Sequence, residues 1–215
     1  GEYWVGKSPS TPGEFERGVI NAAADAAETM GLSLAELLSR THIFAHGTTV
    51  ATNALVTRSG SKVGLITTRG HEDAILIGRV HQKVAGLSNW QIRDLASLQK
   101  ADPIVPKRLI KGAIERMDCF GQAVVPLNAE HLDQIIGELL DEGVEAIAVA
   151  TLWSFRNPTH EAQIKAAIEA RAPDLPVGLA SELVPILGEY ERVATTAINA
   201  YLIREARQYL EKLEA

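Results

Sequence analysis

The tetrapeptide His46-Gly47-Thr48-Thr49 gathers the residue types that an anion site needs. Gly47 lets the backbone come close to a ligand, and two hydroxyl groups stand next to an imidazole. A helix that begins at Val50 would add the free N–H groups and the positive dipole end of its first turn. Donors of this kind suit an anion or a polarised carbonyl oxygen.

A second interpretation stays open, because threonine is an ordinary helix N-cap and the histidine could be structural. Position favours a ligand site: residues 41–45 are expected to form a short buried strand, and open α/β folds bind ligands where a strand leads into a helix. Asn53, one helical turn on, is expected to orient the turn. The catalytic residues that we predict are His46, Thr48 and Thr49, with Gly47 and Asn53 in substrate or phosphate binding.

A second polar turn also follows a predicted strand. Residues 62–68 are predicted to form a buried strand, and Thr67, Thr68, Arg69 and Gly70 lie at its carboxyl end. Two adjacent strands that end in such turns would place them side by side at one sheet edge. We predict that these four residues bind substrate or phosphate, with Arg69 as a bidentate anion clamp. Alternatively, Arg69 pairs with Glu72 or Asp73, as most arginines at such turns do.

Composition narrows the classes of protein. The chain has 215 residues, of which 46% are hydrophobic and 22% are charged, as in ordinary globular proteins. A net charge of −6 argues against a nucleic-acid or membrane surface as the main partner. We find neither a membrane-spanning apolar run nor a signal peptide. The single cysteine, Cys119, forms no internal disulfide and fits a reducing cytoplasm, so a cytoplasmic location is expected.

A metal site is not predicted. His42 and His46 have i, i+4 spacing, but on a strand and its turn that spacing does not place two side chains on one face. Cys119 falls at the tip of an expected hairpin with no histidine near it in sequence, so it is not expected to be a nucleophile.

The order of elements predicts an α/β protein. In the first part we expect a strand over 2–7, helices over 13–30, 34–40 and 50–58, the strand over 62–68 and a helix over 71–79. A helical piece is expected over 89–99, and strands over 109–117 and 123–127 are expected to form a hairpin. Three βα units then follow, with helices over 128–142, 157–171 and 190–214 and strands over 144–152 and 176–180, and they predict a parallel layer.

The expected organisation is a partial N-terminal subdomain over residues 1–79, an irregular connection over 80–106, and an α/β subdomain with a hairpin and three βα units over 107–215. The chain begins without a methionine, inside what reads as a strand already in progress. It is therefore expected to be part of a longer gene product.

The sequence resembles the hydantoinase A family, which also includes 5-oxoprolinase and the nucleotide-binding subunits of acetone and acetophenone carboxylases. The matching residues are 46–55, 64–73 with 77–79, 106–125 with Glu115-Arg116-Met117-Asp118, 153–158, and 189–192 followed by 199–202. Within the family, residues 109–112 and 118–122 are closer to the ketone carboxylase subunits.

The resemblance implies an actin-like ATPase fold of the ribonuclease H-like type, of which this chain would hold a half-domain without the first phosphate loop. It implies ATP with Mg²⁺ as cofactor, with phosphate loops that this chain does not contain, so the fragment alone is expected to be inactive. The implied activity is phosphorylation of an amide or enolate oxygen, for opening of a hydantoin- or oxoproline-type ring or for carboxylation of a ketone. The implied partners are a hydantoinase B-type subunit, a possible third small subunit and a small carbonyl substrate.

Other interpretations stay beside this one. Glu189, Tyr190 and Arg192 are candidates for a subdomain junction, where the Glu and Arg could equally form a structural salt bridge. Trp153 and Phe155 are expected to be packing residues. The whole chain could also be a non-catalytic scaffold of a multi-subunit complex. A Rossmann-type dinucleotide binder is disfavoured, because no Gly-x-Gly-x-x-Gly follows any predicted strand.

Overall fold

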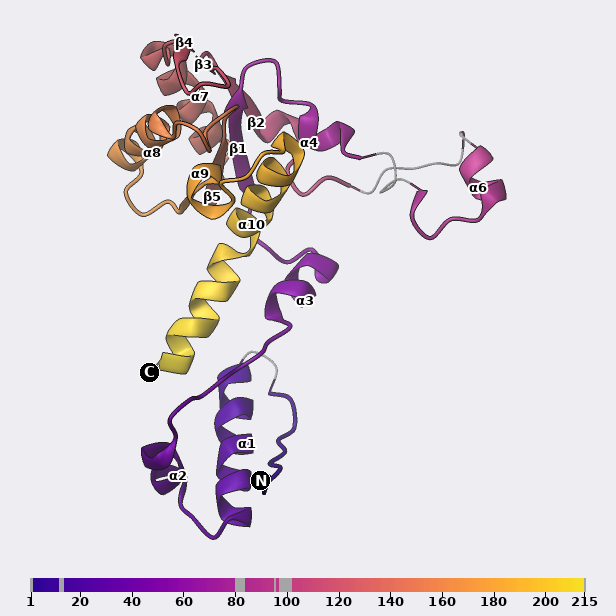
Figure 1. The fold of residues 1–215 in the computed structure, drawn as a ribbon, viewed down its shortest axis with the longest axis vertical. Helices are drawn as coiled ribbons and strands as arrows, with labels where there is room; N and C mark the ends of the chain where they lie inside the picture. The colour runs from indigo at the N-terminus through magenta and orange to yellow at the C-terminus, as the bar shows by residue number, and fades with distance from the viewer. Residues whose placement is uncertain (1, 12–13, 80–83, 95, 97–101, 215) are drawn as a thin grey trace. The chain divides into compact units, whose positions relative to one another are not determined.

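The computed structural model describes residues 2–11, 14–79, 84–94, 96 and 102–214 (Figure 1). The chain divides into two compact units, one made of residues 1–58 with 204–215 and the other of residues 59–203. We call them the terminal unit and the sheet unit and describe each by itself. Among the described residues, none of the helices has the length and hydropathy of a membrane span.

The sheet unit is built on four parallel strands. Their order in the sheet is β2 (Ile110–Ala113), β1 (Val63–Thr68), β5 (Ala146–Ala150) and β6 (Val177–Leu179). In register, Gly64 pairs with Ile147 and Leu65 with Ala148, and the predicted parallel layer is thereby confirmed. Every residue of β1 and β5 is buried, as expected for strands covered on both faces.

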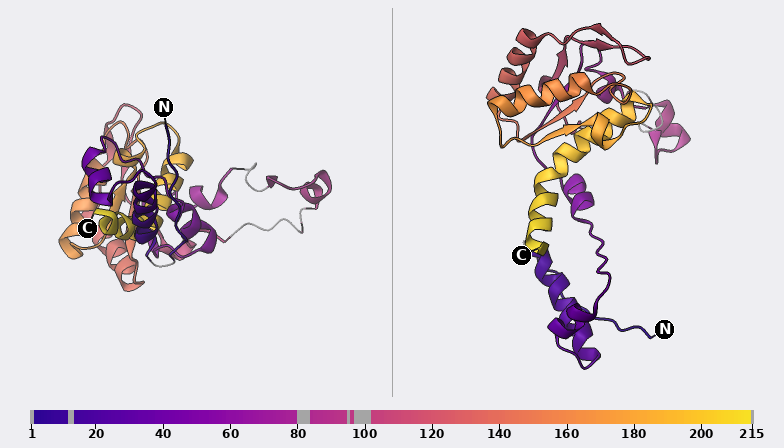
Figure 2. Two further views of the ribbon diagram at one scale, coloured as in Figure 1. Left: turned by 90° about the horizontal axis from the view of Figure 1, so that it is seen from below. Right: turned by 60° about the vertical axis from the view of Figure 1, so that its left-hand side comes forward.

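Helices cover both faces of this sheet (Figure 1, Figure 2). A Cβ added to Gly64 would lie 3.2 Å from Leu139 of α7 (Ala129–Asp141), whereas one added to Gly178 would lie 3.6 Å from Asn199 of α10 (Glu189–Glu214). Gly64 and Gly178 belong to neighbouring register rows, and successive residues of a strand face opposite sides. Therefore α7 and α10 pack on opposite faces, and α8 (Thr159–Arg171) lies beside α7.

Local sequence explains α7 well. Asn128 caps it by accepting a hydrogen bond of 2.9 Å from the N–H of His131. Gly143, with φ +69°, follows its C-cap. Four apolar residues at helical spacing face the sheet and are buried: Leu132, Ile135, Ile136 and Leu139. The helix predicted over 128–142 is confirmed.

The predicted hairpin is only half correct. Its turn is present, since β3 (Arg116–Met117) pairs antiparallel with β4 (Ala123–Val125) and the N–H of Asp118 donates to the carbonyl of Gln122 at 2.9 Å. The strand expected over 109–117 is instead two strands, because residues 110–113 pair in parallel with β1. The backbone groups along that edge of β1 thus gain hydrogen-bond partners. A short 3-10 helix, η1 (Lys107–Leu109), leads into β2.

The terminal unit contains α1 (Phe15–Thr29), α2 (Leu34–Arg40), α3 (Val50–Thr57) and the last turns of α10. A capping box starts α2, where Ser33 and Glu36 bond each other's backbone N–H groups. The predicted helices over 34–40 and 50–58 are confirmed, as is that over 13–30 for its described residues, while residues 12–13 lie outside the described residues. Few apolar residues of this unit are buried: among the described residues, Ala27, Ala54 and Tyr209.

Two predicted strands of this unit are wrong. The structure has no strand at residues 2–7 or 41–45, and residues 41–49 are exposed. A strand exists only where a neighbour takes up its N–H and C=O groups, and none of the described residues pairs with either segment. The expectation of two adjacent strands ending in similar turns therefore fails for the described residues.

Smaller differences concern helix length. The helix expected over 71–79 is reduced to α4 (Ala74–Ile77), and that over 89–99 is α6 (Asn89–Arg93), with residues 95 and 97–99 outside the described residues. The short helix α9 (Ala180–Leu183) was not predicted. Strand β1 hydrogen-bonds to both β2 and β5, so it belongs to the sheet unit. The division into segments 1–79, 80–106 and 107–215 stays a prediction.

Candidate functional site

The terminal unit contains a pocket of about 620 Å³ around residues 44–50. This volume falls within the range of small-molecule sites in proteins. Its walls come from α1, the loop over 8–11, the exposed segment before α3 and one residue of α10, Tyr209. The predicted site residues His46, Gly47, Thr48, Thr49 and Asn53 all line it.

The floor of the pocket includes the start of α3. The hydroxyl of Thr48 accepts from the N–H of Val50 at 3.2 Å, which is a turn contact before the helix and not an N-cap bond. Thr49 is the N-cap residue, but its side chain makes no cap hydrogen bond. Its carbonyl accepts from the N–H of Asn53 at 2.8 Å, and its hydroxyl lies 3.4 Å from the amide nitrogen of Asn53. The first-turn N–H groups of Ala51 and Thr52 have no intrahelical acceptor.

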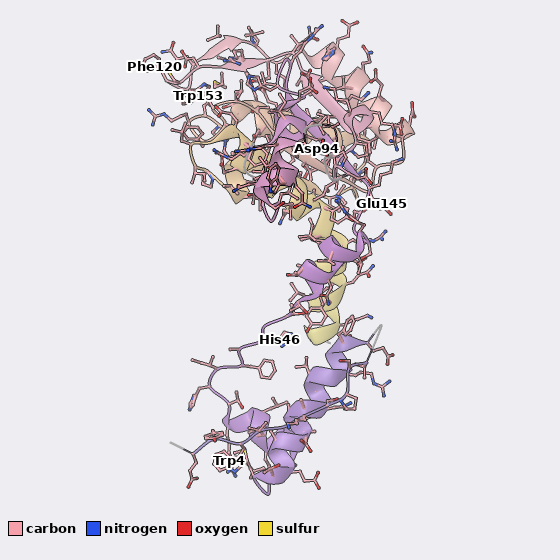
Figure 3. All side chains as sticks on the ribbon, turned by 90° about the vertical axis from the view of Figure 1, so that its right-hand side faces the viewer. Trp4, His46, Asp94, Phe120, Glu145 and Trp153 are labelled. Carbon is pink, nitrogen blue, oxygen red and sulfur yellow. The ribbon has the colours of Figure 1, made fainter. Side chains whose placement is uncertain are left out.

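His46 is joined to α10. Its Nε2 forms a hydrogen bond with the hydroxyl of Tyr209, and the two ring centroids lie 5.7 Å apart at an interplanar angle of 38°. Figure 3 labels His46 on the segment that leads into α3. Tyr209 is 163 residues away in sequence, so no local pattern could have indicated it.

The chemistry of the pocket fits phosphate oxygens. Its described lining offers hydroxyl, amide, imidazole and backbone N–H donors, and none of these residues is acidic. A phosphate could therefore accept from the threonine hydroxyls and the free N–H groups of α3 without facing a carboxylate. In the described residues no three Asp, Glu, His or Cys side chains gather as a group that could hold a metal ion.

Thr67 and Thr68 lie in β1 of the sheet unit, and both are buried. The hydroxyl of Thr67 donates to the carbonyl of Ala150 at 2.9 Å. The hydroxyl of Thr68 donates to Glu115 and accepts from the N–H of Leu152 at 2.9 Å. Both hydroxyls are thus engaged in holding the carboxyl ends of β1 and β5 together.

Arg69 and Gly70 form the exposed turn after β1, where Gly70 has φ +92°. Glu72 bonds to the N–H of Gly70 at 2.8 Å, and Asp73 forms an ion pair with Lys107. Neither acid forms an ion pair with Arg69 in the structure, although pairing with one of them was the alternative to an anion clamp. Only the backbone N–H of Arg69 is engaged among the described residues, with the carbonyl of Ala113 at 2.9 Å.

The sequence did not indicate a buried polar cluster of Glu115, His160 and Glu161, which lies at the carboxyl ends of β1 and β5. Glu115 and His160 are 4% and 5% exposed, and Nδ1 of His160 lies 2.6 Å from the carboxylate of Glu115. Glu161, which is fully buried, accepts from the N–H groups of Thr151 and Ser181 at 2.8 Å each. These side chains satisfy backbone and hydroxyl groups where β1 and β5 end.

Arg192 is 2% exposed and belongs to this sheet unit. It donates to the hydroxyl of Ser154 at 2.6 Å and to the carbonyl of Thr151 at 3.0 Å, and its guanidinium lies 5.3 Å from the ring centroid of Phe155. Burial lowers the pKa of Arg192, while the carboxylates of Glu161 and Glu189 act in the opposite direction. Its bonds fix the loop after β5, in which Trp153 has a left-handed φ of 58°.

The other two residues of this predicted group lie at the start of α10. Glu189 is its first residue, and the guanidinium of Arg79 lies 5.9 Å from the ring centroid of Tyr190. Arg79 also forms an ion pair with Glu191. The rings of Trp153 and Phe155 pack against each other at a tilt of 39°, with centroids 5.6 Å apart.

The structure therefore places the five predicted residues His46, Gly47, Thr48, Thr49 and Asn53 in one pocket, together with Tyr209. It places Thr67, Thr68, Arg69 and Gly70 at the carboxyl end of β1, and Arg192 beside the loop after β5. The sheet unit is an α/β domain with a parallel sheet covered on both faces, and the terminal unit contains the donor-lined pocket.

The chain belongs to the hydantoinase/oxoprolinase N-terminal region family, whose model matches residues 1–172. The resemblance seen in the sequence is thereby confirmed. The chain is 40% identical over 209 residues to the acetophenone carboxylase gamma subunit of Aromatoleum aromaticum, covering 95% of this chain and 29% of that subunit. It is 34% identical over 215 residues to the caprolactamase subunit alpha of Pseudomonas jessenii, covering 100% of this chain and 30% of that subunit.

A solved structure of acetone carboxylase in nucleotide-free form is also similar. Its TM-score is 0.92 at 30% identity, covering 100% of this chain and 31% of that one. The predicted fold class, an α/β half-domain of the actin-like ATPase type, is confirmed by this match. The chain spans about three tenths of the length of the relatives it matches.

Proposed function

We propose that this chain is part of an ATP-dependent enzyme subunit that activates a carbonyl substrate by phosphorylation. The observation that carries the proposal is the pocket at the start of α3, which is lined by His46, Thr48 and Thr49. The relatives support the ATP dependence, since both the acetone carboxylation and the caprolactamase of the solved structures are described as ATP-dependent.

Bound ATP with magnesium would supply the phosphoryl group. The residues of this chain would bind and orient an anionic oxygen: Thr48 and Thr49 with their hydroxyls, the first turn of α3 with its N–H groups, and His46 with its imidazole. Asn53 would hold Thr49 in place through the amide that faces its hydroxyl. Arg69 would act as a separate anion clamp at the end of β1, with Gly70 shaping its turn.

The substrate class is a small carbonyl compound. Acetone and acetophenone are ketones and caprolactam is a cyclic amide, so the relatives share a carbonyl oxygen as the atom to be activated. Either carboxylation of a ketone or hydrolytic opening of a hydantoin- or oxoproline-type ring fits this chemistry. Relatives named as alpha and gamma subunits support a multi-subunit assembly, and we propose a hydantoinase B-type partner with a possible third small subunit.

The test uses the complete subunit assembled with its partner subunits. Replacing Thr48 and Thr49 by Ala should lower ATP-dependent turnover of the carbonyl substrate by about 10²–10³-fold for each donor lost from the reacting oxygen. Size-exclusion chromatography must show that the assembly stays intact. Thr29→Ala is the matched control, because its hydroxyl bonds only within α1. Unchanged turnover of both threonine variants would rule out the site.

A non-catalytic scaffold is the second candidate. It is favoured by the exposed apolar residues of the terminal unit, where Tyr3, Ile43 and Phe44 are 87%, 84% and 57% exposed. Surfaces of this kind often mark contacts with other protein segments. Normal turnover with lost assembly in a Tyr3→Ser, Ile43→Ser variant, at two residues that do not line the pocket, would be its signature, whereas the threonine variants would then leave both properties unchanged.

A further inference from the structure

The hydrogen bond between Tyr209 and His46 gives the pocket a residue outside the His-Gly-Thr-Thr turn. Tyr209 is 7% exposed, while the turn that carries His46 is exposed. Its hydroxyl meets Nε2, and Nδ1 of the same imidazole has no hydrogen-bond partner among the described residues. The buried tyrosine thus holds one nitrogen of a ring whose other nitrogen is left for a ligand.

The direction of this hydrogen bond decides what the ring can do. A phenol O–H is a good hydrogen-bond donor, and the unprotonated nitrogen of a neutral imidazole is a good acceptor for it. The phenol oxygen, by contrast, is a weak acceptor. When the hydroxyl donates to Nε2, the ring proton must sit on Nδ1. The neutral ring then offers an N–H donor, which an anionic oxygen can use. In the reverse arrangement Nδ1 would carry a lone pair and would repel such an oxygen.

We propose that Tyr209 is a positioning residue for His46, which donates to Nε2 and holds the neutral imidazole in its Nδ1–H tautomer. His46 thereby acts as a hydrogen-bond donor to an anionic oxygen, and not as a general base. Its relevance to catalysis rests on the proposed function of the pocket. The ring contact supports this arrangement, because tilted packing at 5.7 Å limits rotation of the imidazole.

Histidine nitrogen NMR tests the tautomer without any substrate. The 215-residue chain is labelled with ¹⁵N-histidine, and two-bond ¹H–¹⁵N spectra are recorded at about pH 8.5, well above the ordinary imidazole pKa. A His46→Asn variant assigns the His46 signals among the six histidines. We expect Nδ1 in the protonated range and Nε2 in the unprotonated range. A His46 in the Nε2–H form would overturn the proposal.

Tyr209→Phe keeps the ring and removes the hydroxyl. In this variant the two nitrogen resonances of His46 should exchange ranges, as the ring returns to the Nε2–H form that free histidine prefers. Tyr201→Phe is the matched control, because Tyr201 lies on the same helix, is 6% exposed and packs against Gly60. Equal spectra of His46 in the parent and in Tyr209→Phe would overturn the proposal. If Tyr209→Phe does not fold, the tautomer of the parent still decides.

Inorganic phosphate then separates this inference from the proposed function. If the pocket binds anions, added phosphate shifts the Nδ1 resonance of His46 in the parent, and at least tenfold more phosphate is needed for the same shift in Tyr209→Phe. An Nδ1–H tautomer that does not respond to phosphate would support the positioning role and count against an anion site. A response in Tyr209→Phe at the same phosphate concentration as in the parent would overturn the positioning role.

Discussion

At the scale of single residues, the pocket is a cluster of uncharged donors. His46, Thr48, Thr49 and Asn53 each lie within it, and the free N–H groups of α3 add a positive dipole end. By contrast, the hydroxyls of Thr67 and Thr68 are used inside the protein. Residues of the same type therefore serve different purposes, and only their hydrogen-bond partners separate the two roles.

Gly47 offers the sharpest single substitution in the pocket. A Cβ added there meets no atom within 4 Å, so Gly47→Ala should change the free energy of unfolding by less than about 0.5 kcal/mol. If a ligand lies against this backbone, the new methyl group should raise the dissociation constant of ATP for the complete subunit about tenfold or more. Isothermal calorimetry measures this constant. Gly137→Ala, in α7, is the control and should leave it unchanged.

Glu115 is expected to matter for stability and not for ligand binding. Glu115→Ala leaves the hydroxyl of Thr68 and Nδ1 of His160 without their buried acceptor. We expect a loss of about 3 kcal/mol in the free energy of unfolding, measured by urea denaturation. Glu169→Ala, on the exposed side of α8, should change it by less than about 0.5 kcal/mol. If Glu115→Ala lowered the free energy of unfolding as little as Glu169→Ala does, the buried cluster would not be stabilising.

At the scale of elements, helix ends and apolar spacing decide most of what forms. The helices α2 and α7 have side-chain caps and fall where their sequences predict. Strands behave differently. Residues 41–45 are as apolar as a strand should be, but none of the described residues pairs with them in a sheet. Residues 110–113, by contrast, pair in parallel with the edge of β1. Pairing, and not composition, separates these two outcomes.

One link between elements is expected to depend on pH. Lys111 of β2 lies 2.6 Å from Glu138 of α7, and this hydrogen bond lowers the pKa of Glu138 below its ordinary value of 4.5. A lowered folded-state pKa gives stability that is present above pH 4.5 and is lost as pH falls through the folded value. Because Glu138 is 42% exposed, the contribution should be below about 1 kcal/mol.

Glu138→Gln should therefore be less stable than the parent at pH 7, with the difference shrinking as the pH falls below 4.5. Urea denaturation between pH 3 and pH 7 measures it. Glu169→Gln is again the control, since the exposed Glu169 has no ion pair among the described residues. A difference between Glu138→Gln and the parent that does not change with pH would contradict the ion-pair explanation.

At the scale of the whole molecule, the two compact units differ in how much they bury. The sheet unit has two strands that are buried along their whole length. Only three apolar residues of the terminal unit are buried among the described residues. The pocket, however, lies within the terminal unit. The proposed site is thus carried by the part of the chain with the smaller core.

Hydrogen exchange should reflect this contrast. Amides of β1 and β5 are expected to exchange most slowly, because their opening requires loss of the buried sheet. Residues 43–48, which are exposed and belong to no helix or strand, should exchange fastest of the described segments. Mass spectrometry of peptic peptides measures both in one experiment. Equal protection of residues 43–48 and of β5 would contradict this picture.

The sequence by itself determined the parallel βα layer, the capped helices and the family. These depend on apolar spacing and on caps within a few residues, which are local properties of the chain. It also singled out the His-Gly-Thr-Thr turn, since those donors are adjacent. Only the tertiary structure decided that residues 41–45 are not a strand, that Thr67 and Thr68 bond internally, and that Tyr209 meets His46. Each of these depends on partners far away along the chain, and no local pattern encodes such partners.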